Sequence, residues 1–138
     1  MIELTEDMRE AINNSLADGH PVVFASVSAD GAPRLGFVGS IHVHSSDQLS
    51  IWLRKADSAS AENIRQNPKL AFLYRNADKR QGWQFQGQAR IVDDAATRQR
   101  VFDGAPEVER NFDKEMQGHA VVIDLDRVIE RGQVIMER

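Results

Sequence analysis

The alternation of hydrophobic and polar positions along the chain predicts six strands and a protein that is mainly β. Residues 81–92 alternate most regularly, with Trp83 and Phe85 on one side of the strand and glutamines on the other. Residues 22–28 begin with an unbroken apolar run, which is typical of a strand that is buried on both faces. The other four strands are predicted at 33–44, 49–53, 69–74 and 119–125, and residues 128–136 can add a further short one.

Helical spacing of apolar residues, together with capping and helix-breaking residues, predicts four helices, at 6–17, 60–66, 93–102 and 107–116. Short turns join the first three strands, and Asp30-Gly31 is the strongest turn signal, so these strands are expected to form an antiparallel meander. Because short strands must hide their edges, we expect one domain, residues 1–138, built as a small antiparallel barrel with helices packed outside it.

Composition narrows the classes of function. No apolar run approaches the roughly 20 residues of a membrane span, and the acidic N-terminus is neither a signal nor a transit peptide, so we expect a cytoplasmic protein with no membrane partner. The chain has no cysteine, which excludes disulfides, thiolate metal sites and cysteine nucleophiles. Its net charge of −4 argues against a nucleic-acid partner, because such proteins usually need a basic surface.

The polar segment 54–60 is the first candidate for a binding site. It follows a predicted strand and opens a predicted helix, whose free backbone N–H groups attract anions. Ser58 and Ser60 add hydroxyl donors, and Arg54 and Lys55 add positive charge, so the segment can hold a phosphate. A solvated turn with a serine N-cap is the alternative explanation of the same residues.

Three other features each have two explanations. Gly36 and Gly39, in the middle of the second predicted strand, either open the backbone to a flat ligand or mark a bulge. His42 and His44 share a strand face, but zinc needs a third ligand that nothing in the sequence places nearby, so we expect polar strand-face histidines and no metal. Trp83 either stacks on an aromatic cofactor or fills the core.

Taken in order, these segments resemble the pyridoxamine 5′-phosphate oxidase-like, flavin-binding split β-barrels. The resemblance begins with the strand 22–28 and the turn at Asp30-Gly31, and it covers about residues 5–130. The resemblance rests on the order of these segments along the chain and not on any single segment. Its further parts are Pro33, Leu49-Ser50-Ile51-Trp52-Leu53, Glu62-Asn63-Ile64, Asn67-Pro68-Lys69-Leu70-Ala71, the strand 83–92 with Gly87, and the strand 120–125.

The resemblance implies a six-stranded antiparallel split β-barrel with flanking helices, in which a homodimer holds two FMN molecules at its interface. The second strand would pass along the flavin, the turn and helix start after the third strand would hold the phosphate, and the strand near Gln81 would line the ring from the other subunit. The corresponding cofactor-binding residues are Phe37, Val38, Gly39, Ser40, Ile41, Arg54, Lys55, Ser58, Ser60, Gln81, Trp83 and Gln84.

The chain departs from the family pattern in two places. Ala59-Ser60 stands in the turn where many members carry a basic residue, and losing one charge-assisted contact to a phosphate costs about 1.5–3 kcal/mol. The tail after Asp124 lacks the tryptophan of the substrate-binding motif found in true pyridoxamine phosphate oxidases. We therefore do not expect vitamin B6 synthesis.

The leading hypothesis is a flavin-dependent oxidoreductase with a small-molecule substrate, and the sequence identifies no catalytic acid or base. The alternative is a non-catalytic or regulatory split-barrel dimer with weak or altered cofactor binding. F420 and haem are two further cofactors to consider. F420 has an acidic tail that prefers a basic groove, which the net charge does not favour, and haem needs an axial histidine such as His42 or His44.

Overall fold

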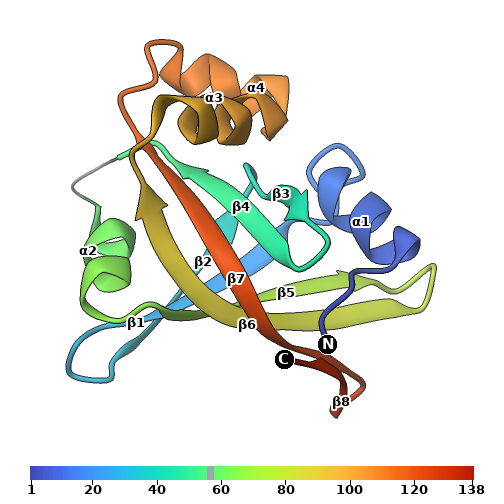
Figure 1. Ribbon diagram of the computed structural model, residues 1–138. Coiled ribbons are helices and arrows are strands. Elements are labelled where there is room, and N and C mark those ends of the chain that lie inside the picture. The colour runs from blue at the N-terminus through green and yellow to red at the C-terminus, as the bar shows by residue number, and fades with distance from the viewer. Residues whose placement is uncertain (56–57) are drawn as a thin grey trace.

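The computed structural model describes residues 1–55 and 58–138, which form one antiparallel sheet with helices against its outside (Figure 1). The strands are β1 (Val22–Val27), β2 (Pro33–Val38), β3 (His42–Ser45), β4 (Gln48–Leu53), β5 (Lys69–Asn76), β6 (Gln81–Val92), β7 (His119–Glu130) and β8 (Gln133–Glu137). The helices are α1 (Glu6–Asn13), α2 (Ala59–Gln66), α3 (Ala95–Gly104), α4 (Glu107–Arg110) and the 3₁₀-helix η1 (Asn111–Asp113).

The strand order shows how the sheet curls into a split barrel. The order is β2-β1-β5-β6-β7-β4-β3, and β8 pairs with β7. β2 and β3 lie at opposite ends of this order, yet only the linker Gly39-Ser40-Ile41 separates them in the chain. Because the four Cα–Cα steps from Val38 to His42 span at most about 14 Å, the two ends of the sheet are held close together, and the barrel is split between them.

The single strand predicted at 33–44 is wrong, because it breaks at this linker. β2 pairs with β1 and β3 pairs with β4, so two separate hairpins form instead of a three-stranded meander. The Ser40 hydroxyl accepts a hydrogen bond from the Trp52 backbone N–H (2.9 Å) and donates one to the Trp52 carbonyl (3.0 Å). The side chain of Ser40 thus makes the contacts with β4 that the backbone of a continuous strand would make.

The predicted fold class, mainly β with flanking helices in a split barrel, is confirmed, while several boundaries differ. The described residues contain eight strands rather than six, because the strand 33–44 divides and the tail forms β8. The first helix ends at Asn13, and the helix predicted at 107–116 is only one turn of α4 followed by η1. None of the helices in the described chain has the length and apolarity that a membrane crossing requires.

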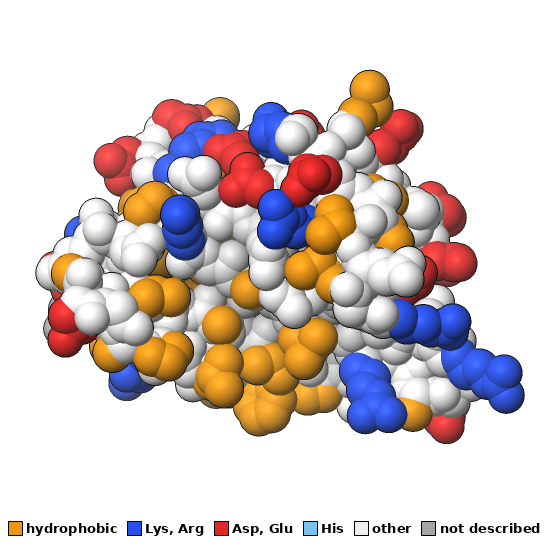
Figure 2. Space-filling view, turned by 90° about the horizontal axis from the view of Figure 1, so that it is seen from below, with side chains coloured by type: hydrophobic (Ala, Val, Ile, Leu, Met, Phe, Trp, Pro, Cys, Tyr) orange, Lys and Arg blue, Asp and Glu red, His pale blue; other side chains and the backbone are white. Residues whose placement is uncertain are grey.

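The outer surface of β2, β1 and β5 is apolar. Cross-strand pairing places Val23 between Phe37 and Leu73 in one row. Phe37 is 75% and Leu73 48% exposed, and Figure 2 shows hydrophobic side chains gathered on one face, with Lys and Arg side chains beside them. Burial therefore alternates along β1 in the single chain, whereas the sequence predicted burial on both faces. This surface, called the outer face below, consists of Val23, Ala25, Leu35, Phe37, Ala71 and Leu73.

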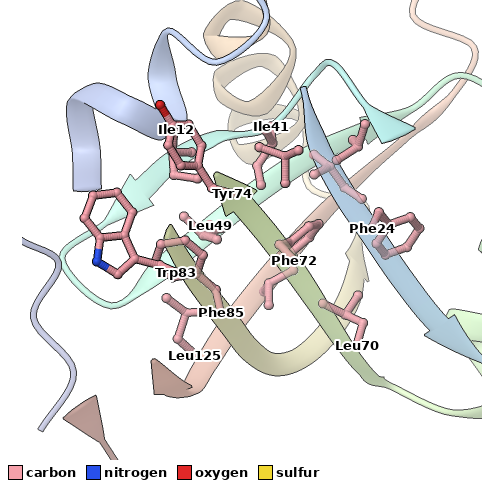
Figure 3. Close-up of a cluster of buried hydrophobic side chains, with 14 of the residues drawn as sticks. Ile12, Phe24, Ile41, Leu49, Leu70, Phe72, Tyr74, Trp83, Phe85 and Leu125 are labelled. Atoms are coloured by element: carbon pink, nitrogen blue, oxygen red, sulfur yellow. The ribbon is translucent and has the colours of Figure 1, made fainter. Parts of the chain in front are cut away.

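Aromatic side chains fill the barrel interior (Figure 3). Phe24 stacks on Phe72 with 5.5 Å between ring centroids, and Tyr74 stacks on Trp83 with 5.8 Å between centroids. The aromatic rings come from β1, β5 and β6, and α1 adds Ile12 from the side of β3. Packing of this kind fixes the strand positions, because each large ring contributes substantial apolar burial.

A second cluster holds α3 against the sheet, with Trp52 and Phe102 edge to face at 5.1 Å. The last residue of α3, Gly104, lies so close to His42 that a Cβ there would overlap the imidazole ring. His42 is therefore buried, unlike the surface histidine expected from the sequence, and its Nε2 lies 3.0 Å from the Ser50 hydroxyl. Burial lowers the pKa of His42 below its ordinary value.

Gly87 lies at a β-bulge where the backbone of the neighbouring strand comes close. The register between β6 and β7 shifts between Gln86 and Gly87, and a Cβ at Gly87 would overlap the carbonyl of Asp124.

We expect Gly87→Ala to lower the free energy of unfolding by about 1–3 kcal/mol, measured by urea denaturation. Gly36→Ala in β2 is the matched control, since a Cβ there meets no atom within 4 Å, and it should stay within about 0.5 kcal/mol of the wild type. Equal losses in both variants would contradict the close approach at Gly87.

Candidate functional site

A cleft of about 550 Å³, the linker cleft, lies where the barrel is split. Its volume is within the usual range of small-molecule sites. The end of β2, the following linker, the end of β4, the start of α2 and the segment 109–117 form its walls. The lining residues are Phe37, Val38, Gly39, Ser40, Trp52, Leu53, Arg54, Lys55, Ser58, Ser60, Glu109, Phe112, Asp113 and Gln117. The fold thus brings together eight of the twelve residues predicted to bind the cofactor.

The start of α2 forms the polar end of the linker cleft. Ser58 is the N-cap of α2, and its hydroxyl accepts a hydrogen bond from the Ala61 backbone N–H at 3.2 Å. The N-cap explanation of Ser58 is therefore confirmed, and its hydroxyl is already engaged. The backbone N–H groups of Ala59 and Ser60 belong to the first turn, where a helix offers no internal acceptor. Ala56 and Asp57, within the predicted segment 54–60, lie outside the described residues.

Two cations stand beside this helix start. The guanidinium of Arg54 lies 4.5 Å from the centre of the Phe112 ring, a distance at which a cation is attracted to an aromatic face. Lys55 follows it in the chain and is exposed. Neither side chain forms an ion pair with another residue in the described part of the chain. Both positive charges are therefore available to an anion in the cleft.

Two carboxylates face these cations from the segment after α3. Glu109 lies against Gly39, where a Cβ would overlap its carboxylate. Asp113 accepts hydrogen bonds from Trp52 Nε1 (2.9 Å) and from the backbone N–H of Gln117 (2.9 Å) and Gly118 (2.8 Å). Partial burial opposes ionisation of Asp113, but these hydrogen bonds outweigh it and hold the pKa of the carboxyl below its usual value.

Six residues of the linker cleft were not among the predicted site residues. They are Trp52, Leu53, Glu109, Phe112, Asp113 and Gln117. Four of them lie between 109 and 117, and they reach the cleft only because α3 packs on β4 and β7. No local pattern marks that segment, since its acidic and polar residues are also what a solvated helix contains. The only available signal was the position of Trp52 at the end of the third predicted strand.

The other four predicted cofactor residues lie elsewhere in the single chain. Ile41 is 1% exposed and belongs to the barrel interior. Trp83 fills the core against Tyr74, and its Nε1 donates to Glu130 at 2.9 Å. Its edge nevertheless reaches a second cavity of about 570 Å³, the arginine cavity. The lining residues of that cavity are Leu73, Tyr74, Arg75, Ala77, Arg80, Gln81, Gly82, Trp83, Gln84, Ile129, Arg131 and Gly132.

Both cavities border the outer face. Phe37 lines the linker cleft, Leu73 lines the arginine cavity, and both side chains pair across Val23 on that face. Because β2 and β5 are separated only by β1, these two positions are about 10 Å apart. A molecule bound against the outer face would therefore reach both cavities.

The histidines lie apart from both cavities. Neither His42 nor His44 lines the linker cleft or the arginine cavity. His44 lies beside Arg100, with 3.4 Å between its Nε2 and the guanidinium Nη1. Within residues 1–55 and 58–138, no group of three His, Cys, Asp or Glu side chains is arranged to hold a metal ion.

Comparisons with known proteins agree with this architecture. No curated protein matches the chain in sequence. Among solved structures, HupZ of Group A Streptococcus is 19% identical, with a TM-score of 0.76 over 95% of this chain and 96% of that one. A Clostridium acetobutylicum protein of the pyridoxinephosphate oxidase family, related to general stress protein 26, is 12% identical, with a TM-score of 0.67 over 97% and 96%.

A third similar structure is an FMN-binding protein from Syntrophomonas wolfei, 9% identical, with a TM-score of 0.61 over 96% of this chain and 88% of that one. Identities this low show a shared fold and nothing further. The sequence itself gives the family, because the family model described as pyridoxamine 5′-phosphate oxidase matches residues 5–128. The match spans most of the chain, and the protein therefore belongs to the pyridoxamine 5′-phosphate oxidase family.

Proposed function

We propose that this protein is a homodimer that binds FMN in the linker cleft and acts as a flavin-dependent oxidoreductase on a small molecule. One observation carries the proposal. Residues 37–40, which the family resemblance assigned to the flavin, line the same cleft as Ser58 and Ser60, which it assigned to the phosphate, although the hairpin of β3 and β4 separates the two groups in the chain. Arg54 and Lys55 line that cleft too. FMN, when bound, supplies hydride transfer at its ring, while the protein binds and orients it.

The start of α2 fits the phosphate of FMN. The backbone N–H groups of Ala59 and Ser60 and the hydroxyl of Ser60 offer donors, and the helix dipole favours an anion at this end. Arg54 and Lys55 stand where they can add charge-assisted contacts. These two residues replace the basic residue that many family members carry in place of Ala59 or Ser60.

The linker fits the flavin ring once Glu109 moves. Phe37 is 75% exposed and offers an aromatic surface beside Gly39, whose missing side chain leaves the backbone open. In the structure the carboxylate of Glu109 covers Gly39. That carboxylate is the end of a flexible side chain, so a rotamer change would move it away from the glycine.

The outer face supports the homodimer. A contiguous apolar patch that includes Leu35 (72% exposed) and Phe37 is typical of a surface that binds a partner. The outer faces of two copies in contact would bring the linker cleft of one copy near the arginine cavity of the other. Gln81 and Gln84 of the partner subunit would then face the flavin, as the family resemblance implies.

Loss of tight cofactor binding is the competing proposal, and two observations favour it. Ala59 places no charge at the start of α2, and the carboxylates of Glu109 and Asp113 lie in the same cleft as Arg54 and Lys55. Carboxylates repel a phosphate dianion and weaken the attraction from the two cations. Under this proposal the protein is a non-catalytic or regulatory dimer.

Visible absorbance and flavin fluorescence during a titration with FMN test the first proposal. We expect saturable binding by the wild type. The Arg54→Gln/Lys55→Gln double variant should bind FMN roughly tenfold or more weakly, because it loses charge-assisted contacts. Lys114→Gln is the control, since Lys114 follows η1 but does not line the cleft. No binding at FMN concentrations on the order of 10 μM would favour the non-catalytic alternative.

Analytical ultracentrifugation tests the homodimer. We expect the wild type to sediment with twice the 15.5 kDa mass of one chain. Leu35→Glu should shift the protein to monomers without loss of folding, because the side chain is 72% exposed in the single chain and is buried only by the partner. Val108→Glu, on α4 and 52% exposed, is the matched control and should remain dimeric. A monomeric wild type would refute the interface.

A further inference from the structure

The arginine cavity gathers positive charge in a chain whose net charge is −4. Arg75 comes from β5, Arg80 from the turn between β5 and β6, and Arg131 from the turn between β7 and β8. The fold therefore assembles the three arginines from two separate regions of the sequence. None of the three guanidinium groups has a hydrogen bond or an ion pair with another residue in the described part of the chain.

The walls between the arginines are mostly apolar. Leu73 and Ile129 line the cavity, together with Ala77 and with parts of Tyr74 and Trp83, whose stacked rings belong to the barrel core. Arg75 pairs across the strands with Gly82, which also lines the cavity and adds no side chain to it. A surface of this composition suits a ligand that has an apolar body and an anionic end.

The backbone gives a second, independent observation. Arg80 has φ of 54° and Arg131 has φ of 50°, a left-handed conformation that residues with side chains rarely adopt. Turns of this kind ordinarily carry glycine, asparagine or aspartate. Three non-glycine residues in the described chain have positive φ, and two of them are these arginines. Arginine at such strained positions points to a role for the side chain beyond the turn itself.

Neighbouring acidic side chains do not cancel this charge within the cavity. Glu130 accepts a hydrogen bond from Trp83 Nε1 and does not line the cavity. Lys79 belongs to the same turn as Arg80 but lines a different cavity, which also contains the carboxylates of Asp7, Glu10 and Asp18. The positive charge of Lys79 thus faces acidic groups, while the three arginines face none among the lining residues.

We propose that the arginine cavity binds a small organic oxyanion, a carboxylate or a phosphate ester, whose apolar body packs between Leu73 and Ile129. Guanidinium groups recognise both kinds of anion through paired N–H donors. The anion site itself is independent of the proposed function. That the bound anion is the substrate of the oxidoreductase rests on the proposed function. Because Gln81 and Gln84 line the same cavity, the bound anion would lie beside the flavin of the partner subunit.

NMR titration of the FMN-free protein tests the site. The probes are inorganic phosphate, phenyl phosphate and benzoate, observed through the Nε–Hε signals of the arginines and the amide of Gly82. We expect saturable shifts at Arg75, Arg80 and Arg131, and binding of phenyl phosphate at least tenfold tighter than of inorganic phosphate. Tighter phenyl phosphate than benzoate identifies a phosphate ester site, and the reverse identifies a carboxylate site. Shifts that do not saturate with any probe would overturn the proposal.

Variants distinguish binding in the arginine cavity from a general attraction of anions to positively charged side chains. Arg80→Asn and Arg131→Asn keep a residue that tolerates positive φ, so the fold and the thermal unfolding temperature should be retained. Each should weaken binding of the tighter organic probe roughly tenfold. Lys79→Gln, in the same turn as Arg80, should leave the affinity unchanged within about twofold, because Lys79 does not line the cavity. Equal weakening by Lys79→Gln and Arg80→Asn would overturn the proposal.

These experiments distinguish failure of the anion site from failure of the proposed FMN binding. If FMN does not bind but phenyl phosphate or benzoate saturates the arginine cavity, flavin binding is refuted and the anion site stands. If FMN binds and neither organic anion does, the flavin proposal stands and the anion site is refuted.

Discussion

The two hydrogen bonds between the Ser40 hydroxyl and the backbone of Trp52 fix the linker between β2 and β3, and the rest of the structure depends on the position of this linker. They allow the chain to leave one end of the sheet after β2 and to join the other end as β3 without losing its hydrogen bonds to β4. The barrel is split here, so the linker cleft opens here as well. The same break presents Phe37 on the outer face at the rim of the cleft.

The two cavities differ in the charge of their lining residues, and therefore in the ligands that they suit. The linker cleft combines two cations with two carboxylates, so under the proposed function a phosphate would bind at the start of α2, where backbone donors add to the cations. The arginine cavity holds three cations and no carboxylate among its lining residues. Because the outer face connects the two cavities, a dimer formed through that face would join a cofactor site to an anion site.

Local patterns predicted the elements well where hydrophobic period and capping residues agreed. The helix predicted at 60–66 is α2, one residue longer at its start, and Ser58 caps it as its position indicates. The alternation across residues 81–92 matches β6 in full. The start of α2 was predicted because a serine before a helix has a local physical meaning as its N-cap.

Features that depend on distant contacts were beyond local patterns. The break at Ser40 is stabilised by Trp52, twelve residues away in the sequence. Gly36 and Gly39 fitted an open backbone or a bulge equally well, so they did not predict that the strand ends there. Glu109 and Asp113 reach the cleft only through the packing of α3 on the sheet. The positions of Arg80 and Arg131 in one cavity likewise depend on the pairing of β6 with β7.

A crystal structure of the protein grown with FMN tests the central claim most directly. The account predicts two copies in contact through their outer faces, with the phosphate at the backbone of Ala59 and Ser60 and the ring between Gly39 and Gln84 of the partner subunit. Binding of FMN away from the linker cleft, or association of the copies through a different surface, would contradict it.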